Sequence, residues 1–538
     1  MLPETQKAYD YVIVGAGSAG CVLANRLSAD PAVRVLLLEA GGEDRNFWLK
    51  LPVGYFKTIY DERFSRIFDA EGGADIHGRT IKWPRGRILG GSSSINGLIY
   101  IRGQRADYND WERLGALGWN YDAVLPFFKR SEDYAGPPSP YHGKGGELGV
   151  SDLRNNHPYC ERWVEAAQEL GLPRNHDFNA ETDLGVGNYQ LSIRGGWRSS
   201  SSVSFLHPVR SRKNLTVVTH AQVSQVVFSG DKAVGVEWIS KGEKQYTSTT
   251  QEVILSAGAI QSPQVLQLSG IGDGNSLKKL GIRVQVDSPE VGENLQDHYQ
   301  ARTIVRLKRR KSLNNQVRNP LALAAMGAQW MFFNRGPLTV GAGQVGGFAR
   351  TEHALDGRAD MQFNVMPLSV DKPGEPLHDF PGFTATASQC RPSARGSVSI
   401  VDTDPFRAPR IQANYLSTDL DRKTVAAGVR MLREIYNRPS FRDLVEGEVL
   451  PGAAVQGDAG LLEFARRHGS TVFHASGTCR MGSDGRSVVT PDLRVRGVRG
   501  LRVIDASVMP TMVSANTNAA SIMIAEHGAA FITSSAAA

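Results

Sequence analysis

Three closely spaced glycines near the start of the chain point to phosphate-binding chemistry. Gly15, Gly17 and Gly20 follow a short apolar run and precede apolar residues with helical spacing. In a strand–turn–helix of this kind, the first glycine permits the turn, the second admits backbone N–H groups to a pyrophosphate, and the third allows close helix packing. The positive end of the helix dipole then faces the phosphates. The spacing therefore predicts a dinucleotide-binding unit.

A carboxylate follows at the spacing that such a unit requires. The second apolar run, Val35 to Leu38, ends at Glu39, about 20 residues beyond the glycines, where a carboxylate accepts hydrogen bonds from a ribose. Glycines alone also mark ordinary turns, but the strand, helix and second strand occur together here at βαβ distance. This chemistry does not distinguish FAD from NAD.

Two further small-residue turns could hold other parts of the same ligand. Residues 90–97 read Gly-Gly-Ser-Ser-Ser-Ile-Asn-Gly and offer N–H groups and hydroxyls to a second phosphate or a ring. A flexible linker is the alternative, but Leu89 and Ile95 bracket the turn closely with apolar side chains. In the other turn, a predicted strand enters residues 256–258, and Pro263 marks the start of a helix.

The C-terminal part of the chain carries a candidate proton acceptor. His474 lies between an apolar strand and a glycine turn, and imidazole has a pKa near neutral pH. By itself, such a histidine is more often a core residue bonded to a carbonyl. Residues 516–518 precede an apolar helix, whose N-terminus could hold negative charge developing on a ring carbonyl or nitrogen. A simple helix cap is the alternative for Asn516.

These residues need a scaffold, and the hydrophobic pattern indicates which segments supply it. Strands are expected at 215–218, 223–228, 234–238, 252–255 and 501–504, and helices at 106–130, 158–170 and 425–436. The stretch from about 40 to 80 has no clear period and is expected to be a long excursion over the cofactor. Residues 340–460 alternate short apolar runs with turns, which predicts a second domain with an antiparallel sheet.

Bulk composition restricts the class of protein. With 538 residues, 41% hydrophobic and 21% charged, the chain is expected to be a soluble enzyme of two domains or one elaborated domain. A net charge of +7 is too small over such a surface to indicate nucleic-acid binding, and the run Lys308 to Lys311 is interpreted as a solvated loop. Four distant cysteines predict reduced thiols, and the 12 histidines form no metal-ligand pattern.

The apolar segments bear on where the protein acts. The start of the chain shows no basic-then-apolar leader, and no run of about 18 apolar residues occurs, so a cytoplasmic protein is expected. Residues 320–333 form a largely apolar helical stretch interrupted by Gln329. We interpret this stretch as a buried or lid helix, with a peripheral contact with the inner membrane as the alternative.

The chain resembles the glucose–methanol–choline (GMC) oxidoreductases from Asp10 to Ile532, and is most like their bacterial choline-dehydrogenase-like and alcohol dehydrogenase members. Four motifs in family order carry the resemblance: the glycine loop with Glu39, the turn at 90–96, the segment 258–272, and the C-terminal His474 and Asn516.

The resemblance implies FAD rather than NAD. It also implies an α/β (α+β overall) fold, with a Rossmann-like FAD-binding domain and a substrate domain that carries an antiparallel sheet, as in GMC and PHBH-like proteins. The expected FAD-binding domain spans 9–155, 205–310 and 465–532, and the expected substrate-binding domain spans 156–204 and 311–464.

The resemblance also assigns residues to the site. His474 matches the active-site histidine of the family and Asn516 its second catalytic position, whereas His298 and His527 match neither. Ile95 stands where some members tether the flavin through a histidine, so non-covalent FAD is expected. The expected substrate contacts are Phe348, Met366, Val472 and Phe473. The expected cofactor contacts are Gly15, Gly17, Ser18, Ala19, Gly20, Glu39, Ala40, Leu89, Gly90, Gly91, Ser92, Asn96, Gly97, Val223, Ala257, Asp505, Ala506, Asn516, Thr517 and Asn518.

The implied activity is oxidation of a primary alcohol to the aldehyde. His474 would take the hydroxyl proton, flavin N5 the hydride, and Asn516 would hold the substrate oxygen. The electrons would pass to O2 or to a quinone or other acceptor. The apolar walls expected around 341–348 and 361–366 favour a medium-chain, aryl or furanic alcohol over choline. The alternatives are a choline dehydrogenase proper, a non-redox enzyme like the FAD-containing hydroxynitrile lyases, and a flavoprotein scaffold without catalysis. The oligomeric state is not assigned.

Overall fold

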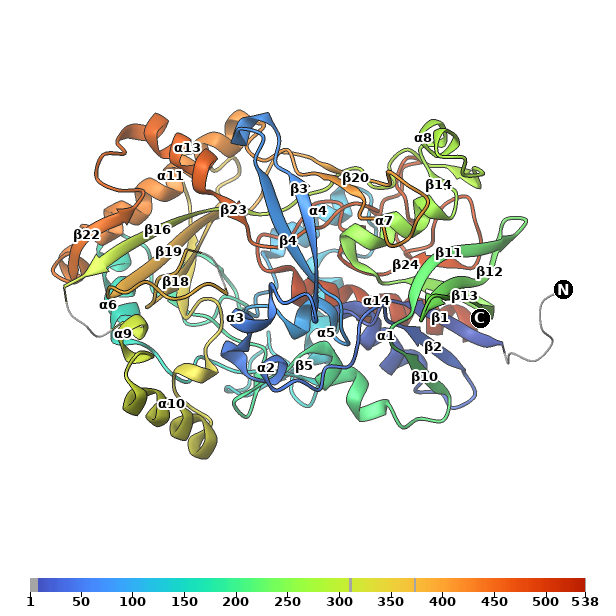
Figure 1. Cartoon of the computed structure of the whole chain (residues 1–538), viewed down its shortest axis with the longest axis horizontal. Helices are drawn as coiled ribbons and strands as arrows, with labels where there is room; N and C mark the ends of the chain where they lie inside the picture. The colour runs from blue at the N-terminus through green and yellow to red at the C-terminus, as the bar shows by residue number, and fades with distance from the viewer. Residues whose placement is uncertain (1–7, 309–311, 372–373, 538) are drawn as a thin grey trace.

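One half of the molecule is built on a largely parallel sheet, seen at the right of Figure 1. The computed structural model describes residues 8–308, 312–371 and 374–537. Parallel strands follow the order β10–β2–β1–β13–β24, and β12 and β11 continue from β13 in antiparallel pairing. The bounds of these strands are β1 Tyr9–Val14, β2 Val35–Leu38, β10 Leu215–Val218, β11 Gln222–Ser229, β12 Lys232–Ser240, β13 Glu243–Leu255 and β24 Leu501–Val503.

The short apolar runs of the sequence form the centre of this sheet. In β1, Val12 and Ile13 are completely buried between β2 and β13, as expected for a strand covered on both faces. Helix α1 (Ser18–Leu27) leaves the carboxyl end of β1 and packs beside α14 (Thr517–Ala537). The first and last helices of the fold therefore lie side by side at the same edge of the sheet.

The other half carries an antiparallel sheet in the order β22–β16–β19–β18–β17–β7, with β23 also paired to β16. Its bounds are β7 Gly185–Asn188, β16 Tyr299–Leu307, β17 Val345–Ala349, β18 Met361–Met366, β19 Gly382–Gln389, β22 Val445–Leu450 and β23 Ser470–Thr471. Helices α6 (Pro158–Glu169) and α11 (Asp419–Tyr436) cover one face. The predicted mixed fold with an antiparallel second sheet is confirmed. Because β16 belongs to this sheet, we propose that the second segment of the substrate-binding domain begins before Tyr299 rather than at 311.

Side-chain alternation gives the antiparallel sheet two different faces. In β18, Phe363 and Val365 pack into the core under α6 and α11, whereas Asn364 and Met366 line a cavity on the opposite face. Strand β16 repeats the pattern, since Gln300 and Arg302 face the cavity. One face of the antiparallel sheet therefore packs on a hydrophobic core, and its other face lines a cavity.

Two segments differ from their expected secondary structure. The stretch 41–80 was expected to be an irregular excursion, but it contains helices α2 (Phe47–Lys50) and α3 (Tyr55–Thr58) and strand β3 (Ser65–Glu71). Strand β3 pairs with β4 (Thr80–Gly86), and with β20 (Ser397–Ser399) and β21 (Arg410–Gln412) these strands form a sheet. The mixed aromatic and charged residues of β3 give no clear period, so the local pattern did not reveal the strand, although β4 follows closely in the chain and only β21 is a distant partner. The helix expected at 106–130 is divided into α4 (Arg105–Arg113) and α5 (Tyr121–Ser131).

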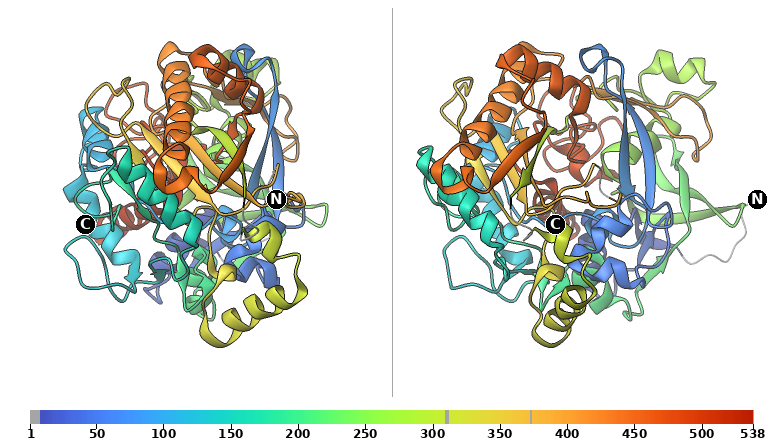
Figure 2. Two further views of the ribbon diagram at one scale, coloured as in Figure 1. Left: turned by 90° about the vertical axis from the view of Figure 1, so that its left-hand side faces the viewer. Right: turned by 60° about the vertical axis from the view of Figure 1, so that its left-hand side comes forward.

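Helix α10 (Pro320–Phe333) is exposed rather than buried. It projects from the lower edge of the molecule in Figures 1 and 2. Of its side chains, only Met326 and Trp330 are buried, while Leu321 is 81% exposed. The expectation of a buried helix is therefore wrong, because none of the described elements covers its outer sides, whereas the lid interpretation stays a prediction. The basic run that precedes it, 308–311, lies outside the described residues except for Lys308.

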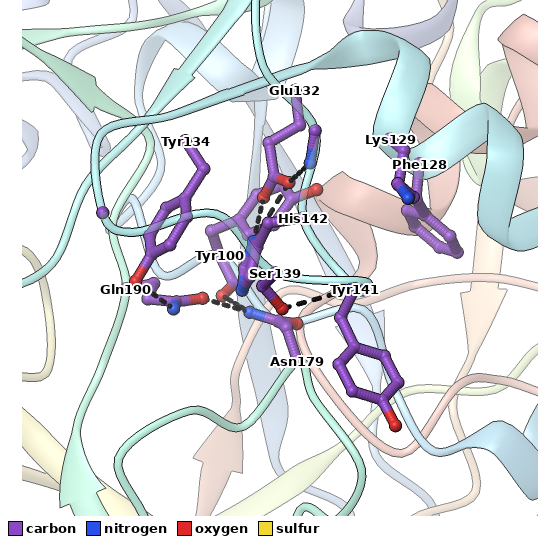
Figure 3. A network of polar contacts seen from close by, with 12 residues as sticks. Tyr100, Phe128, Lys129, Glu132, Tyr134, Ser139, Tyr141, His142, Asn179 and Gln190 are labelled. Atoms are coloured by element: carbon purple, nitrogen blue, oxygen red, sulfur yellow. Dashed lines mark hydrogen bonds and ion pairs between the residues drawn. The ribbon is translucent and has the colours of Figure 1, made fainter.

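A buried polar network joins the segments around residues 100, 132, 142 and 177. His142 Nδ1 lies 3.0 Å from both Glu132 carboxylate oxygens (Figure 3). Its Nε2 lies 2.8 Å from Asp177 Oδ2. Arg102 donates to Glu132 at 2.8 Å, and the Arg102, Glu132 and His142 side chains are almost completely buried. Arg102 and His142 thus face the carboxylates of Glu132 and Asp177 in one network.

Three further features concern possible membrane, disulfide and metal elements. Within the described residues, none of the helices combines the length and hydropathy needed to cross a bilayer. The four cysteines are buried and unpaired. The same residues contain no cluster of histidine, cysteine or carboxylate side chains that could hold a metal ion.

Candidate active site

The three glycines of the first turn have distinct physical roles. Gly15 has a φ of +99°, and an added Cβ there would lie 2.6 Å from the Ser256 carbonyl oxygen. An added Cβ on Gly20 would lie 1.8 Å from the Gly15 carbonyl oxygen, so Gly20 permits α1 to approach β1. Gly17 differs, because a Cβ added there would meet its nearest atom, the Ser256 carbonyl oxygen, only at 3.9 Å and would point into an open hollow. A side chain at Gly17 would fill the space that a pyrophosphate needs.

Glu39 ends β2 beside this turn. Its carboxylate accepts hydrogen bonds from the backbone N–H of Ala16 at 2.9 Å and of Gly41 at 2.8 Å. Burial raises the pKa of Glu39 to about 7, and the two N–H donors oppose that rise. Carboxylate oxygens carry more lone pairs than these two bonds use, so Glu39 can still accept from ribose hydroxyls.

The second glycine turn lies directly against the first. Gly90 donates its N–H to the Ala16 carbonyl at 2.8 Å, and an added Cβ on Gly91 would lie 2.7 Å from Gly17 Cα. Arg198 donates to Asn96 Oδ1 at 2.7 Å and holds the far end of the turn. The two turns, which are some 75 residues apart in the sequence, therefore form a single cradle.

Two adjoining hollows run from this cradle into the space between the sheets, and they share Ser18, Arg85, Ser92, Ala506 and Ser521. Of the predicted residues, the hollow beside the glycines is lined by Gly15, Gly17, Ser18, Ala19, Glu39, Ala40, Gly91, Ser92, Val223, Ala257, Asp505 and Ala506. The hollow toward the antiparallel sheet is lined by Ser18, Ser92, Asn96, Gly97, Met366, Val472, Phe473, His474, Ala506, Asn516, Thr517 and Asn518. Together the hollows form one elongated site, with phosphate-binding groups at one end and His474 at the other.

Four predicted residues lie outside these linings. Gly20, Leu89 and Gly90 support the turns from behind, as their packing and backbone bonds show. Phe348, expected to contact substrate, is instead completely buried in a cluster with Phe178 and Tyr189. The expectation for Phe348 is wrong because Leu98 and Ile99, which belong to the same cluster, line the cavity in its place.

The backbone around His474 is held from several sides. Asp297 Oδ1 accepts the His474 N–H at 2.7 Å, and Asp297 Oδ2 accepts from the Thr471 and Tyr415 hydroxyls. Phe473 adopts a φ of +67°, and its carbonyl accepts from Arg85 at 2.7 Å. Left-handed backbone is costly for a bulky residue, so these bonds define the direction in which the His474 ring points.

His298, which matched no catalytic position in the sequence, contacts the His474 ring. Its Nδ1 lies 2.8 Å from His474 Nδ1, and its Nε2 lies 2.8 Å from the Cys390 carbonyl oxygen. A carbonyl can only accept, so His298 Nε2 carries the proton and His298 Nδ1 is an acceptor. His474 Nδ1 must then be the donor, which leaves the lone pair of a neutral His474 on Nε2. His527, by contrast, is stacked between Phe127 and Phe531 away from this site.

Asn516 faces the free nitrogen of His474. Its Nδ2 lies 3.1 Å from His474 Nε2, and its Oδ1 accepts from Gln362 at 3.4 Å. This orientation agrees with the proton positions derived from Cys390, because the amide donates and Nε2 accepts. Ser18 donates to Asn518 at 2.8 Å, so the N-termini of α1 and α14 meet beside the pair.

The electrostatic surroundings keep both imidazoles neutral. Burial lowers the pKa of His298 to about 4. Burial, His298 and Arg85 together hold the pKa of His474 well below its usual range. At neutral pH, His474 therefore presents an unprotonated Nε2 to the cavity, as a general base requires.

The remaining walls of the cavity are mostly apolar. Tyr55, Phe56, Ile59, Met366 and Val370 contribute much of this surface. Among the described residues that line the cavity, none is a carboxylate, and Arg85 and Arg302 are the cations. A positively charged substrate would therefore meet no opposite charge there.

Comparisons with known proteins agree with this geometry. Residues 9–300 and 392–525 match the N- and C-terminal domain models described as GMC oxidoreductase. A Pseudomonas putida protein named alcohol dehydrogenase [acceptor] is 41% identical over 97% of this chain and 95% of its own length. Human mitochondrial choline dehydrogenase is 39% identical over 98% of this chain and 90% of its own length. A structure of Aspergillus oryzae formate oxidase, described for the effect of a mutation on FAD modification, superposes with a TM-score of 0.92 at 26% identity, covering 99% of both chains.

Proposed function

Because this chain belongs to the GMC oxidoreductase family, whose members depend on FAD and act on alcohols, we propose that it oxidises a primary alcohol to the aldehyde with His474 as the general base. One observation carries this proposal. The unprotonated Nε2 of His474 and the amide of Asn516 face the same cavity, 3.1 Å apart, beside a glycine cradle suited to a dinucleotide.

The residues of the chain fit FAD at this cradle. Gly17 leaves the space for a pyrophosphate, the Glu39 carboxylate would accept from a ribose, and the start of α14, which lines the cavity, would favour negative charge on a bound flavin. FAD, when bound, supplies the acceptor for a hydride at flavin N5. Ile95 lines the cavity in the turn where a histidine would be needed for attachment, so we propose non-covalent binding.

His474 and Asn516 divide the proton chemistry between them. The alcohol O–H donates to His474 Nε2, which takes the proton as the carbon–hydrogen bond loses its electron pair as hydride. Because His474 Nε2 has one lone pair, which accepts from Asn516 in this structure, the amide N–H must turn from Nε2 to the alcohol oxygen when substrate binds. There it stabilises the negative charge that develops on that oxygen. His298 accepts from His474 Nδ1 throughout, so the imidazolium that forms keeps its hydrogen bond.

The cavity favours an uncharged, apolar alcohol over choline. Choline carries a permanent positive charge, and recognition of such cations relies on carboxylates or aromatic cages. Here Tyr55, Phe56 and Phe473 supply aromatic rings, but the described lining has no carboxylate, and Arg302 and Arg85 would repel the cation. We propose a medium-chain, aryl or furanic alcohol as substrate, with O2 or a quinone or other acceptor receiving the electrons.

Anaerobic addition of substrate to the purified yellow enzyme tests the activity. Bleaching of the flavin absorbance by octanol, benzyl alcohol or hydroxymethylfurfural, with little bleaching by choline, is expected. Bleaching by choline at the highest kcat/KM would indicate a choline dehydrogenase proper. No bleaching by any alcohol would contradict the redox proposal and favour a lyase. Peroxide release in air, compared with turnover by an artificial quinone, would identify the acceptor.

A further inference from the structure

Helix α10 gives the molecule an apolar surface that the proposed chemistry does not use. Leu321, Met331, Phe332 and Phe333 are 81%, 67%, 73% and 68% exposed. Exposed apolar areas of this kind mark sites of association. We propose that α10, together with the exposed aromatic side chains at its base, is a docking surface for an anionic lipid bilayer.

The distribution of apolar side chains around α10 favours lipid over a protein groove. At about 100° per residue, Leu321, Leu323 and Met331 point in widely different directions around the helix axis. A helix that docks in a protein groove shows one apolar stripe and a polar face. A helix that is apolar all round needs an apolar medium on every side that its own protein leaves open.

The dimensions of α10 suit the membrane interface. Its 14 residues measure about 21 Å along the axis, less than the roughly 30 Å hydrocarbon core of a bilayer. Met326 and Trp330 attach the helix to the protein along one side. The opposite sides can therefore enter the boundary between headgroups and acyl chains while the body of the protein stays outside.

An aromatic cluster lies at the base of the helix. The Trp330 ring lies 4.6 Å from that of Trp197 and 5.8 Å from that of Phe47, and Phe47 contacts Trp48 at 5.7 Å. Phe47, Trp48 and Trp197 remain between 40% and 48% exposed. Tryptophan concentrates at the headgroup level of membranes, where its ring is partly apolar and its N–H is polar. These partly exposed rings next to α10 are of the type found at the headgroup level of a bilayer.

The chain segment that carries α10 is rich in basic residues, which favours anionic lipids. No aspartate or glutamate occurs between Asp297 and Glu352, a stretch that carries the basic run 308–311. Arg318 and Arg335 flank the helix and are exposed, and within the described residues neither forms an ion pair. Arg318 donates to the Leu377 carbonyl at 3.2 Å, so Arg335 is the simpler charge to test. Basic residues beside an inserted apolar segment strengthen binding to anionic headgroups.

The docking surface is connected to the substrate cavity. Met326 packs in a cluster with Leu368 and Val370, against which Phe56 and Met366 also pack. Three of these residues, Phe56, Met366 and Val370, line the cavity. If the proposed function holds, docking brings the cavity wall close to a medium in which apolar alcohols are concentrated. This last step rests on the proposed function, whereas the docking surface does not.

Vesicle co-sedimentation of the full-length holoenzyme tests the docking surface. Binding to mixed phosphatidylethanolamine–phosphatidylglycerol vesicles is expected, with weaker binding to phosphatidylcholine vesicles. The double variant Leu321→Gln, Phe332→Gln is expected to weaken binding by about 10-fold or more, because it removes two large apolar side chains from the lipid. The variant Arg335→Gln is expected to weaken binding to the anionic vesicles about 5-fold and to leave the neutral vesicles unaffected.

A matched control uses apolar residues exposed elsewhere. Leu355 is also 81% exposed and Phe406 is 48% exposed, so Leu355→Gln, Phe406→Gln changes the same residue types away from α10. This variant is expected to bind vesicles like the parent. Oxidation of a water-soluble alcohol, measured without vesicles, is expected to stay unchanged in every variant, which separates this test from that of the proposed function.

Two results would overturn the proposal. Equal vesicle binding by the parent and by Leu321→Gln, Phe332→Gln would show that α10 does not enter lipid. Absence of vesicle binding, combined with a dimer in light scattering that the same variant dissociates, would assign the surface to a second copy of the chain.

Discussion

His474 and His142 are both enclosed by the fold, yet their surroundings shift their pKa values in opposite directions. The His474 ring contacts another imidazole and an amide, and its pKa lies well below the usual range because of burial, His298 and Arg85. The His142 ring contacts Glu132 and Asp177. Burial alone would lower the pKa of His142, but the hydrogen bonds to Asp177 and Glu132 outweigh it and raise the pKa.

The difference shows how the fold separates a base from a structural cation. A carboxylate does lie next to His474, but Asp297 is directed at the backbone N–H of His474 and not at its ring. The imidazole therefore stays neutral and able to accept a proton. In the His142 network the carboxylates face the ring itself, so the imidazolium is stabilised and the group holds segments together.

Removal of the base is expected to have the largest effect. In His474→Ala, the anaerobic rate of flavin bleaching by substrate should fall by about 10²- to 10⁴-fold, because no other group takes the hydroxyl proton. His142→Gln is the matched histidine control and should keep most of that rate. An unchanged rate in His474→Ala would show that His474 is not the base, and that its lowered pKa has no part in the reaction.

Removal of the amide should have the next largest effect. In Asn516→Ala, kcat is expected to fall by about 10²-fold, because one donor to the developing alkoxide is lost. The change should appear in kcat more than in KM, since the bond strengthens as charge develops. Steady-state kinetics on a variant shown to hold a full complement of FAD would measure it. A change confined to KM would assign Asn516 to substrate binding alone.

The role of His298 is to position the proton of His474, and two substitutions separate this role from packing. His298→Leu removes the acceptor for His474 Nδ1–H and should lower kcat by about 10-fold, with a changed pH profile of kcat/KM. His298→Gln can donate to the Cys390 carbonyl and accept from His474, so it should restore much of the rate. Equal loss in both variants, with the pH profile unchanged, would indicate packing only.

Substitution of His142 should change the stability of the protein and the dependence of that stability on pH. The pKa of His142 is raised on folding, so its contribution is fully present below its unfolded pKa of about 6.5 and is lost as pH rises through the folded value. His142→Gln should destabilise the protein by about 1–3 kcal/mol at about pH 6 and by less at about pH 9. Thermal unfolding of parent and variant at both pH values measures this difference. A difference that grows with pH would contradict the assigned charge state.

Local patterns in the sequence were enough to predict the cofactor cradle. Gly15, Gly17 and Gly20 act through the backbone of one short turn, and Glu39 ends the next strand of the same βαβ unit. The buried parallel strands were predicted for the same reason, since continuous apolar runs identify them without knowledge of their partners. His474 and Asn516 were predicted through family resemblance, because neither residue has a distinctive local pattern.

The tertiary structure decided what depends on partners that are distant in the chain. The sheet that contains β3 is completed by β21, more than 300 residues away, although the longest pairing of β3 is with the nearby β4. The sequence of β3 has no clear period, so only the structure identified the strand. His298 acquires its role only because the fold brings it to 2.8 Å from His474. The exposure of α10 was likewise not predictable, since an apolar helix has the same sequence pattern whether protein or another medium surrounds it. Composition determines which groups can do chemistry here, and packing determines which of them meet and what charge they carry.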